Sequence, residues 1–147
     1  MTENTPQRVV LITGAASGIG AAVCRRLSAP GCHIALHTRG SQNSRKQDLE
    51  AVARQAEEAG SSVLMLFGDL SEDGVATNLI NQTQEYFGRL DQIVSNAGFA
   101  DRRLLGEVDR ETLDRSLKAM PGAFFDLITA ALPTLIASDW GRVVAVS

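Results

Sequence analysis

A cluster of glycines near the N-terminus has the residue types and spacing that best fit a chemical role. Residues 13–20 read TGAASGIG, directly after an apolar run and at the start of a helical pattern. Gly14 allows a tight turn, Gly18 lets backbone N–H groups approach a pyrophosphate, and Gly20 lets the helix pack closely on the sheet. The N-terminus of a helix adds unpaired N–H donors and partial positive charge. We predict a phosphate-binding turn; the alternative is a glycine-rich turn that binds no ligand.

A second informative segment follows the second expected strand. Residues 36–41 read LHTRGS and contain no acid. In a dinucleotide-binding fold, a carboxylate here would bond the ribose hydroxyls and repel a 2′-phosphate. Arg39, next to Thr38, instead offers a forked guanidinium that matches phosphate oxygens, and His37 and Ser41 would add donors. The segment favours NADP(H), with NAD(H) possible; the alternative is that Arg39 is a solvated loop arginine.

The elements that would position these residues alternate along the chain. Apolar runs predict strands over 8–13, 33–37, 62–67, 92–95 and 142–146. Helical patterns lie between them, over 18–29, 45–59, 71–87, 109–120 and 124–136. We expect Gly60 to be a left-handed cap, Ser71 and Asp109 to be N-caps, and Pro121-Gly122 to interrupt the last helical stretch. Strands that alternate with helices and are apolar throughout indicate a parallel sheet covered on both faces.

Three motifs fall at the ends of successive expected strands. TGAASGIG follows the first, Asp69-Leu70 the third, and Asn96-Ala97-Gly98 the fourth. Together they resemble the short-chain dehydrogenase/reductase family, in the type similar to the 3-oxoacyl-acyl-carrier-protein reductases. The resemblance extends from Arg8 to Ser147. It implies an α/β fold: a Rossmann-type doubly wound parallel sheet with five strands in the order 3-2-1-4-5, the C-terminal strands being missing.

The resemblance also implies a set of cofactor contacts across the carboxyl ends of the strands. The pyrophosphate and the neighbouring ribose would lie against Gly14, Ser17, Gly18, Ile19 and Gly20. Asp69 would accept from the adenine amino group beside the backbone of Leu70. The adenosine would pack against Asn96, Ala97 and Gly98. Ser95 stands where the family usually has a second asparagine.

The catalytic groups implied by the resemblance are a serine, a Tyr-x-x-x-Lys pair and a helix asparagine, and none is assigned in this chain. The only tyrosine, Tyr86, lacks a lysine four residues later and is expected to be a packed aromatic at a helix end. Ser147 takes the first of two serine places, so the catalytic one would come next. Ala119 or Met120 occupies the asparagine position. We expect residues 1–147 to be a single cofactor-binding domain, truncated before the Ser/Tyr/Lys segment.

Composition narrows the class of protein further. The chain has 147 residues, a net charge of −3, 44% hydrophobic and 21% charged residues, which are ordinary values for one soluble domain. A pI of 5.3 without a cluster of basic residues argues against nucleic-acid binding. No apolar run approaches about 18 residues, which argues against a membrane span. The N-terminus lacks the features of a secretory signal, and Cys24 and Cys32 match neither a redox pair nor a zinc site, so a cytoplasmic location is expected and no metal is assigned.

The resemblance implies an oxidoreductase that transfers a hydride between a nicotinamide and the carbonyl or alcohol carbon of a small-molecule substrate. It also implies a homo-oligomer, a dimer or tetramer, for the complete protein. Two alternatives remain: a non-catalytic dinucleotide-binding module and an inactive truncated fragment. Arg102 and Arg103 follow the third motif and would either line a site for an acidic substrate or be ordinary surface arginines.

Overall fold

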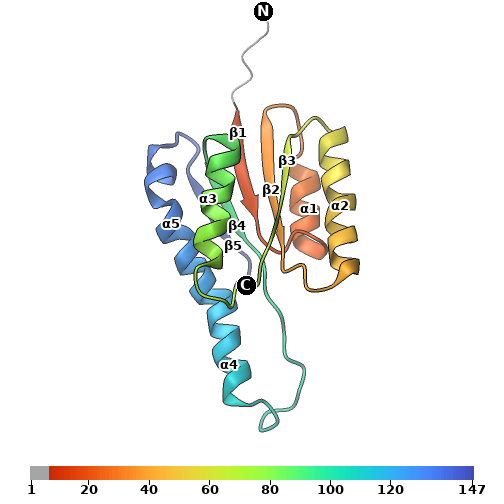
Figure 1. The fold of residues 1–147 in the computed structure, drawn as a ribbon, viewed down its shortest axis with the longest axis vertical. Coiled ribbons are helices and arrows are strands. Elements are labelled where there is room, and N and C mark those ends of the chain that lie inside the picture. Colours follow the sequence, from red (N-terminus) through yellow and green to blue (C-terminus); the bar gives the residue numbers. More distant parts are fainter. Residues whose placement is uncertain (1–6) are drawn as a thin grey trace, which may run out of the picture.

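The computed structural model of the chain describes residues 7–147, which contain one parallel sheet of five strands. The strand order is β3-β2-β1-β4-β5, as predicted (Figure 1). The strands are β1 (Arg8–Ile12), β2 (Cys32–Thr38), β3 (Val63–Phe67), β4 (Gln92–Ser95) and β5 (Arg142–Ala145). The helices are α1 (Gly18–Leu27), α2 (Asn43–Glu58), α3 (Val75–Phe87), α4 (Arg110–Leu117), a π-helical turn (Lys118–Gly122) and α5 (Ala123–Ala137).

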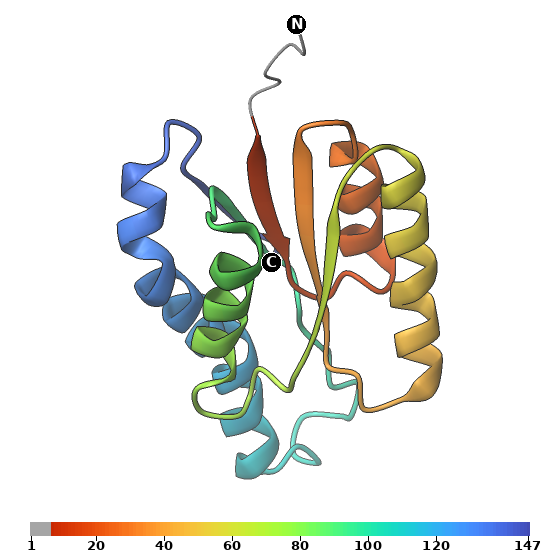
Figure 2. The ribbon, with the colours of Figure 1, turned by 45° about the horizontal axis from the view of Figure 1, so that its top comes forward.

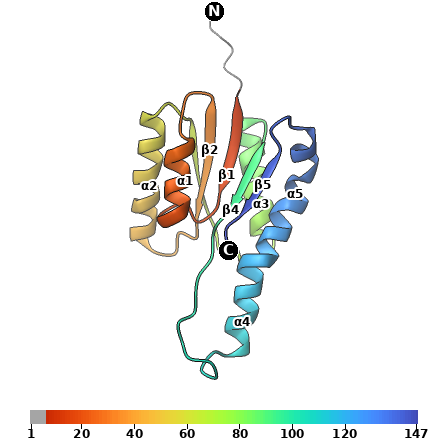
Figure 3. The same ribbon diagram turned by 180° about the vertical axis from the view of Figure 1, so that it is seen from behind.

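Helices cover both faces of the sheet, α1 and α2 on one face and α3 and α5 on the other (Figures 1 and 3). Because side chains alternate along a strand, β1 contributes to two separate cores. Val10 and Ile12 pack with side chains of α1 and α2, whereas Val9 and Leu11 pack with those of α3 and α5. The two covered faces explain why the central strands are apolar throughout.

The expected break at Pro121-Gly122 is wrong, because the chain stays helical from Arg110 to Ala137. Proline lacks an N–H and its ring clashes with the preceding turn of an α-helix. A wider turn relieves this conflict, and the Ala123 amide bonds to the carbonyl of Lys118, five residues earlier. Such a π-turn lets a helix continue through an obstacle that ends most helices.

This continuous helix is also longer and more apolar than the sequence suggested. By length and composition alone, the stretch Arg110–Ala137 is sufficient to cross a membrane, with a mean hydropathy of 1.5 in its most apolar window. One such helix is weak evidence, because core helices of soluble proteins meet the same criteria. Within α5, Leu127 and Ala131 are buried in the core shared with α3, whereas Phe125 and Ile136 are exposed.

The caps at helix ends were predicted with mixed success. Gly60 adopts the left-handed conformation after α2, with φ +99°, and Asp109 caps α4 by accepting from the Thr112 amide. The prediction that Ser71 caps α3 is wrong, because the helix begins four residues later, at Val75. Ser71 instead donates its backbone N–H and its hydroxyl to Asp69. This local turn keeps the chain out of the helical conformation.

A buried carboxylate joins the amino ends of the central strands. The side chain of Asp91, which precedes β4, is 1% exposed. It accepts hydrogen bonds from the Val9 amide of β1, from the forked guanidinium of Arg89 and from the hydroxyl of Ser138. The carboxylate therefore ties β1, the approach to β4 and the turn before β5 together. β5 itself pairs with β4 and forms one edge of the sheet, with all of its residues exposed.

Candidate functional site

A cavity of about 470 Å³ lies at the carboxyl ends of β1 to β4, where open α/β sheets bind ligands. Figure 2 shows the first turns of α1 and α2 at the same end of the sheet as the loop before α4. Nine of the twelve predicted cofactor residues line the cavity: Gly14, Ser17, Thr38, Arg39, Asp69, Leu70, Asn96, Ala97 and Gly98. The other three do not: Gly18 and Ile19 are exposed beside it, and Gly20 is buried beneath the turn.

The glycine turn and the Asn96-Ala97-Gly98 turn are connected by four hydrogen bonds. The Thr13 hydroxyl accepts from the amides of Asn96 and Ala97, each at 3.0 Å. The side-chain amide of Asn96 donates to the carbonyls of Thr13 and Gly14, each at 3.1 Å. The two turns are more than 80 residues apart in the sequence, yet they form one wall of the cavity.

Three positions of the first turn require glycine for different physical reasons. A Cβ on Gly14 would lie 2.8 Å from the Ala97 Cα, and one on Gly20 would lie 2.4 Å from the Gly14 carbonyl oxygen. Gly20 therefore allows close packing against the turn, rather than against the sheet as predicted. A Cβ on Gly18 would meet nothing within 4 Å, although its φ is +55°. The space beside Gly18, at the first turn of α1, fits the close approach of a phosphate group.

Replacing Thr13 with valine is expected to lower the free energy of unfolding by about 1–3 kcal/mol. Valine has nearly the same shape but cannot accept the hydrogen bonds from the amides of Asn96 and Ala97. Thermal denaturation of Thr13→Val and Thr13→Ser would measure the loss, since serine keeps the acceptor. Equal melting temperatures for the two variants would contradict the role of the hydroxyl.

Arg39 extends from the end of β2 into the predicted phosphate region. Its Nε donates to the Ser41 hydroxyl at 3.0 Å, which orients the guanidinium and leaves its two terminal nitrogens for a ligand. Within residues 7–147 it forms no ion pair with a carboxylate. Thr38 lies beside it, buried at the strand end.

The expectation that His37 would donate to a phosphate is wrong. The ring is 2% exposed, and its Nε2 lies 2.9 Å from the Gly68 carbonyl oxygen. Burial lowers the pKa of His37, so the ring is neutral near pH 7, with its proton on Nε2 facing that carbonyl. His37 therefore ties the end of β2 to the end of β3. Its Nδ1 is buried and has no hydrogen-bond partner among the described residues.

Asp69 offers a negatively charged acceptor to the cavity. Burial alone would raise the pKa of its carboxyl, but the hydrogen bonds from Ser71 and the charges of Arg39 and Arg115 lower the pKa below its usual value. One oxygen accepts from Ser71, and the other lies 4.0 Å from Arg115. The second oxygen is the one suited to accept from a ligand amino group.

Several lining residues were missed because no motif contains them. Gln42 and Arg45 come from the start of α2, Phe99 comes from the loop before α4, and Arg115 comes from α4. The guanidinium of Arg115 lies 5.5 Å from the centre of the Phe99 ring. Three of the four charged side chains that line the cavity are arginines, although the whole chain has a net charge of −3. The cavity therefore favours an anionic ligand.

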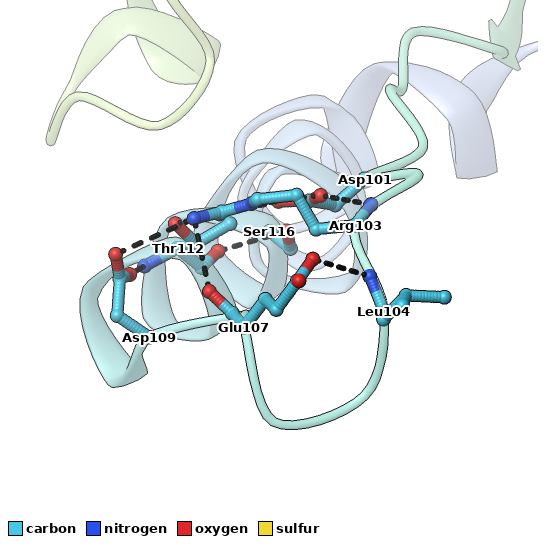
Figure 4. Close-up of polar contacts among 7 residues, drawn as sticks. All are labelled: Asp101, Arg103, Leu104, Glu107, Asp109, Thr112 and Ser116. Carbon is cyan, nitrogen blue, oxygen red and sulfur yellow. Dashed lines mark hydrogen bonds and ion pairs between the residues drawn. The ribbon is translucent and has the colours of Figure 1, made fainter.

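Arg103 is occupied within its own loop (Figure 4). Its guanidinium bonds to the Asp101 carboxylate, the Thr112 hydroxyl and the Glu107 carbonyl, and it lies 3.7 Å from Asp109. Hydrogen bonds from Arg103 lower the pKa of Asp101 to about 2. Arg103 thus shapes the loop before α4, which leaves it unavailable for an acidic substrate.

Three further residues were considered for the positions of catalytic groups. Tyr86, at the end of α3, does not line the cavity; it contacts Phe87 edge-on at 4.7 Å and is 61% exposed, so it is less packed than expected. At the position expected for a helix asparagine, Ala119 lines the cavity, while the thioether of Met120 lies against Gly98.

The strand order, the helices on both faces and the glycine turn after β1 define a Rossmann-type α/β domain. Residues 8–147 match the family model described as short chain dehydrogenase. The chain belongs to this family.

Curated relatives and solved structures agree with this assignment. The 11-beta-hydroxysteroid dehydrogenase 1A of Arabidopsis thaliana is 35% identical over 99% of this chain and 41% of its own length. A 3-oxoacyl (acyl-carrier-protein) reductase from Agrobacterium tumefaciens with NADP bound has a TM-score of 0.81 and 33% identity over 96% of this chain and 52% of its own. A short chain dehydrogenase from Burkholderia cenocepacia in complex with NADP has a TM-score of 0.85 and 29% identity, over 97% of this chain and 56% of its own. The chain thus spans about half the length of the relatives that it matches.

Proposed function

We propose that this chain binds NADP(H) and forms the cofactor-binding part of an oxidoreductase that acts on the carbonyl or alcohol group of a small molecule. The observation that carries the proposal is the positively charged cavity, in which Arg39 stands where an NAD-binding site would have an acid. NAD(H) would bind more weakly, because it lacks the group that Arg39 is suited to bind. The NADP in the related solved structures supports the same cofactor.

Each part of the cavity contacts a different group of the cofactor. The first turn of α1, with Ser17, Gly18 and Ile19, faces the diphosphate, and Gly14 and Gly20 give that turn its shape. Asp69 accepts from the adenine amino group, beside Leu70. The adenosine packs against the Asn96-Ala97-Gly98 turn. When bound, the nicotinamide supplies the hydride, and the chain itself contributes binding and orientation.

We further propose that residues 1–147 act as a single cofactor-binding domain of a cytoplasmic homo-oligomer, a dimer or tetramer. Apolar side chains exposed along the long helix support the oligomer, because they suit a helix-to-helix interface: Leu113, Leu117, Phe125, Leu132 and Ile136. The two free, buried cysteines suit a reducing compartment.

A second candidate is a dinucleotide-binding module without catalytic activity. The observation in its favour is the apolar contact of Met120 with Gly98, at the position where the family resemblance implies an asparagine. Assays of the full natural protein against carbonyl and alcohol substrates distinguish the two. NADPH binding without turnover would favour the binding module.

Replacing Arg39 with glutamine tests the cofactor assignment. Charge-assisted hydrogen bonds contribute about 1.5–3 kcal/mol, so we expect NADPH to bind roughly 10- to 100-fold more weakly. NADH binding should barely change, since it has no 2′-phosphate. Titration by NADPH and NADH fluorescence measures both affinities. The control is Arg54→Gln, which removes an exposed arginine from α2, the helix that follows Arg39 in the chain. A wild-type protein that binds neither cofactor, or an Arg39→Gln variant with unchanged preference, would contradict the proposal.

A further inference from the structure

Arg45, which lies outside the sequence motifs, links α2 to the glycine turn. It is in the first turn of α2, and its Nη1 donates a hydrogen bond of 2.9 Å to the hydroxyl of Ser17. The two residues are 28 positions apart, and both line the cavity. The side chain of Arg45 is 50% exposed, so a ligand in the cavity can reach its guanidinium.

Neither Arg45 nor Ser17 makes another strong interaction. Ser17 is the N-cap of α1, but its side chain makes no capping hydrogen bond. Arg45 also faces Asp48 at 3.6 Å, as an exposed pair within one helix, and such pairs contribute little to stability. The guanidinium of Arg45 is therefore free to bind an anion at small cost.

Arg39 lines the same cavity from the end of β2. The adjoining first turn of α2 contains no acidic residue, and its N-cap, Gln42, makes no side-chain capping bond. The positive end of the α2 dipole adds to the two guanidinium charges. Arg39, Arg45 and the start of α2 thus all bring positive charge to the cavity, which they share with the carboxylate of Asp69.

We propose that Arg39 and Arg45 bind the 2′-phosphate of NADP(H) together, which makes Arg45 a second residue that determines cofactor specificity. This inference rests on the proposed function. A phosphate monoester carries nearly two negative charges and three acceptor oxygens at neutral pH, more than one guanidinium can pair with. In the absence of the phosphate, Arg45 keeps its bond to Ser17.

Replacing Arg45 with glutamine tests the inference on the full natural protein. We expect the dissociation constant for NADPH to rise roughly tenfold or more, and that for NADH to change by less than about twofold. Isothermal titration calorimetry at low salt measures both, because salt screens exposed charges. Arg54→Gln is again the matched control. We expect 2′,5′-ADP, which has the phosphate without the nicotinamide, to show the same loss.

Ser17→Ala separates phosphate binding from a purely structural role. If Arg45 acted only by holding the glycine turn through Ser17, both Arg45→Gln and Ser17→Ala would weaken NADPH and NADH equally, and the inference would be overturned. An unchanged NADPH-to-NADH ratio in Arg45→Gln, with the wild type still preferring NADPH, would also overturn it while leaving the proposed function intact. A wild type without that preference would overturn the proposed NADP specificity itself.

Discussion

Gly20→Ala is expected to destabilise the chain and to abolish tight binding of both cofactors. The new Cβ would lie 2.4 Å from the Gly14 carbonyl oxygen and 2.7 Å from the Asn96 side-chain nitrogen. Neither can retreat freely, because the two groups are hydrogen-bonded to each other. Overpacking of this kind costs about 1–3 kcal/mol or more. The shift of the turn would also displace the N–H groups that face the diphosphate.

Chemical denaturation and cofactor titration together measure this effect. Ala22→Ser, on the exposed side of α1, controls for a mild change in the same helix. NADPH and NADH should lose affinity alike, in contrast to the arginine variants, which affect NADPH alone. A Gly20→Ala protein with wild-type stability and wild-type affinity would show that the close contact is not required.

Asp91→Ala is expected to have the largest effect on stability, at about 2–4 kcal/mol, because it removes a buried carboxylate that satisfies two other groups, while its ion-pair partner Arg89 is 44% exposed and can be hydrated. The change leaves the Val9 amide and the Ser138 hydroxyl without their acceptor, and it leaves the Arg89 guanidinium without its charge partner. Urea denaturation of Asp91→Ala, with exposed Asp126→Ala as a control, measures the difference. Equal midpoints for the two variants would contradict the structural role.

The lowered pKa of Asp91 makes the stability of the protein depend on pH. Burial alone would raise the pKa of Asp91, but hydrogen bonds from Arg89, Ser138 and the Val9 amide lower the pKa below its usual value. In the unfolded chain the pKa returns to about 3.9. The contribution of Asp91 is therefore complete above that value and is lost as the pH falls through the lower pKa of the folded state. Asp91→Asn should flatten this acid limb of the stability curve relative to wild type.

Most of the fold could be predicted from local sequence patterns. Strands such as β1 are apolar throughout and bounded by glycine or loop residues, and their alternation with helices leaves few topologies for a parallel sheet. The errors arose where a tertiary or local contact outweighed propensity. Ser71 has the right residue type for an N-cap, but its backbone N–H and its hydroxyl donate hydrogen bonds to the Asp69 carboxylate instead. Pro121 has the right type for a helix break, but the wider π-turn accommodates its ring and the helix continues.

The parts of the candidate site that could be predicted are those built from residues adjacent in the sequence. The glycine turn, Asp69-Leu70 and Asn96-Ala97-Gly98 are each local in sequence, and most of their residues line the cavity. Arg45 and Arg115 could not be predicted, because their place in the cavity depends on how α2 and α4 approach the sheet. His37 failed for a related reason: a pattern of residue types does not reveal that a ring is turned toward the Gly68 carbonyl.

The bonds that join Thr13 and Gly14 to Asn96 and Ala97 have a consequence for biosynthesis. The glycine turn leaves the ribosome early, but the partners that complete its wall are made more than 80 residues later. Contacts so distant in sequence form only after the intervening chain has closed into a large loop. A nascent chain that stops before residue 97 should therefore lack the cofactor site even though its first glycine motif is complete. Cofactor binding would then report that the first four strands have been assembled during translation.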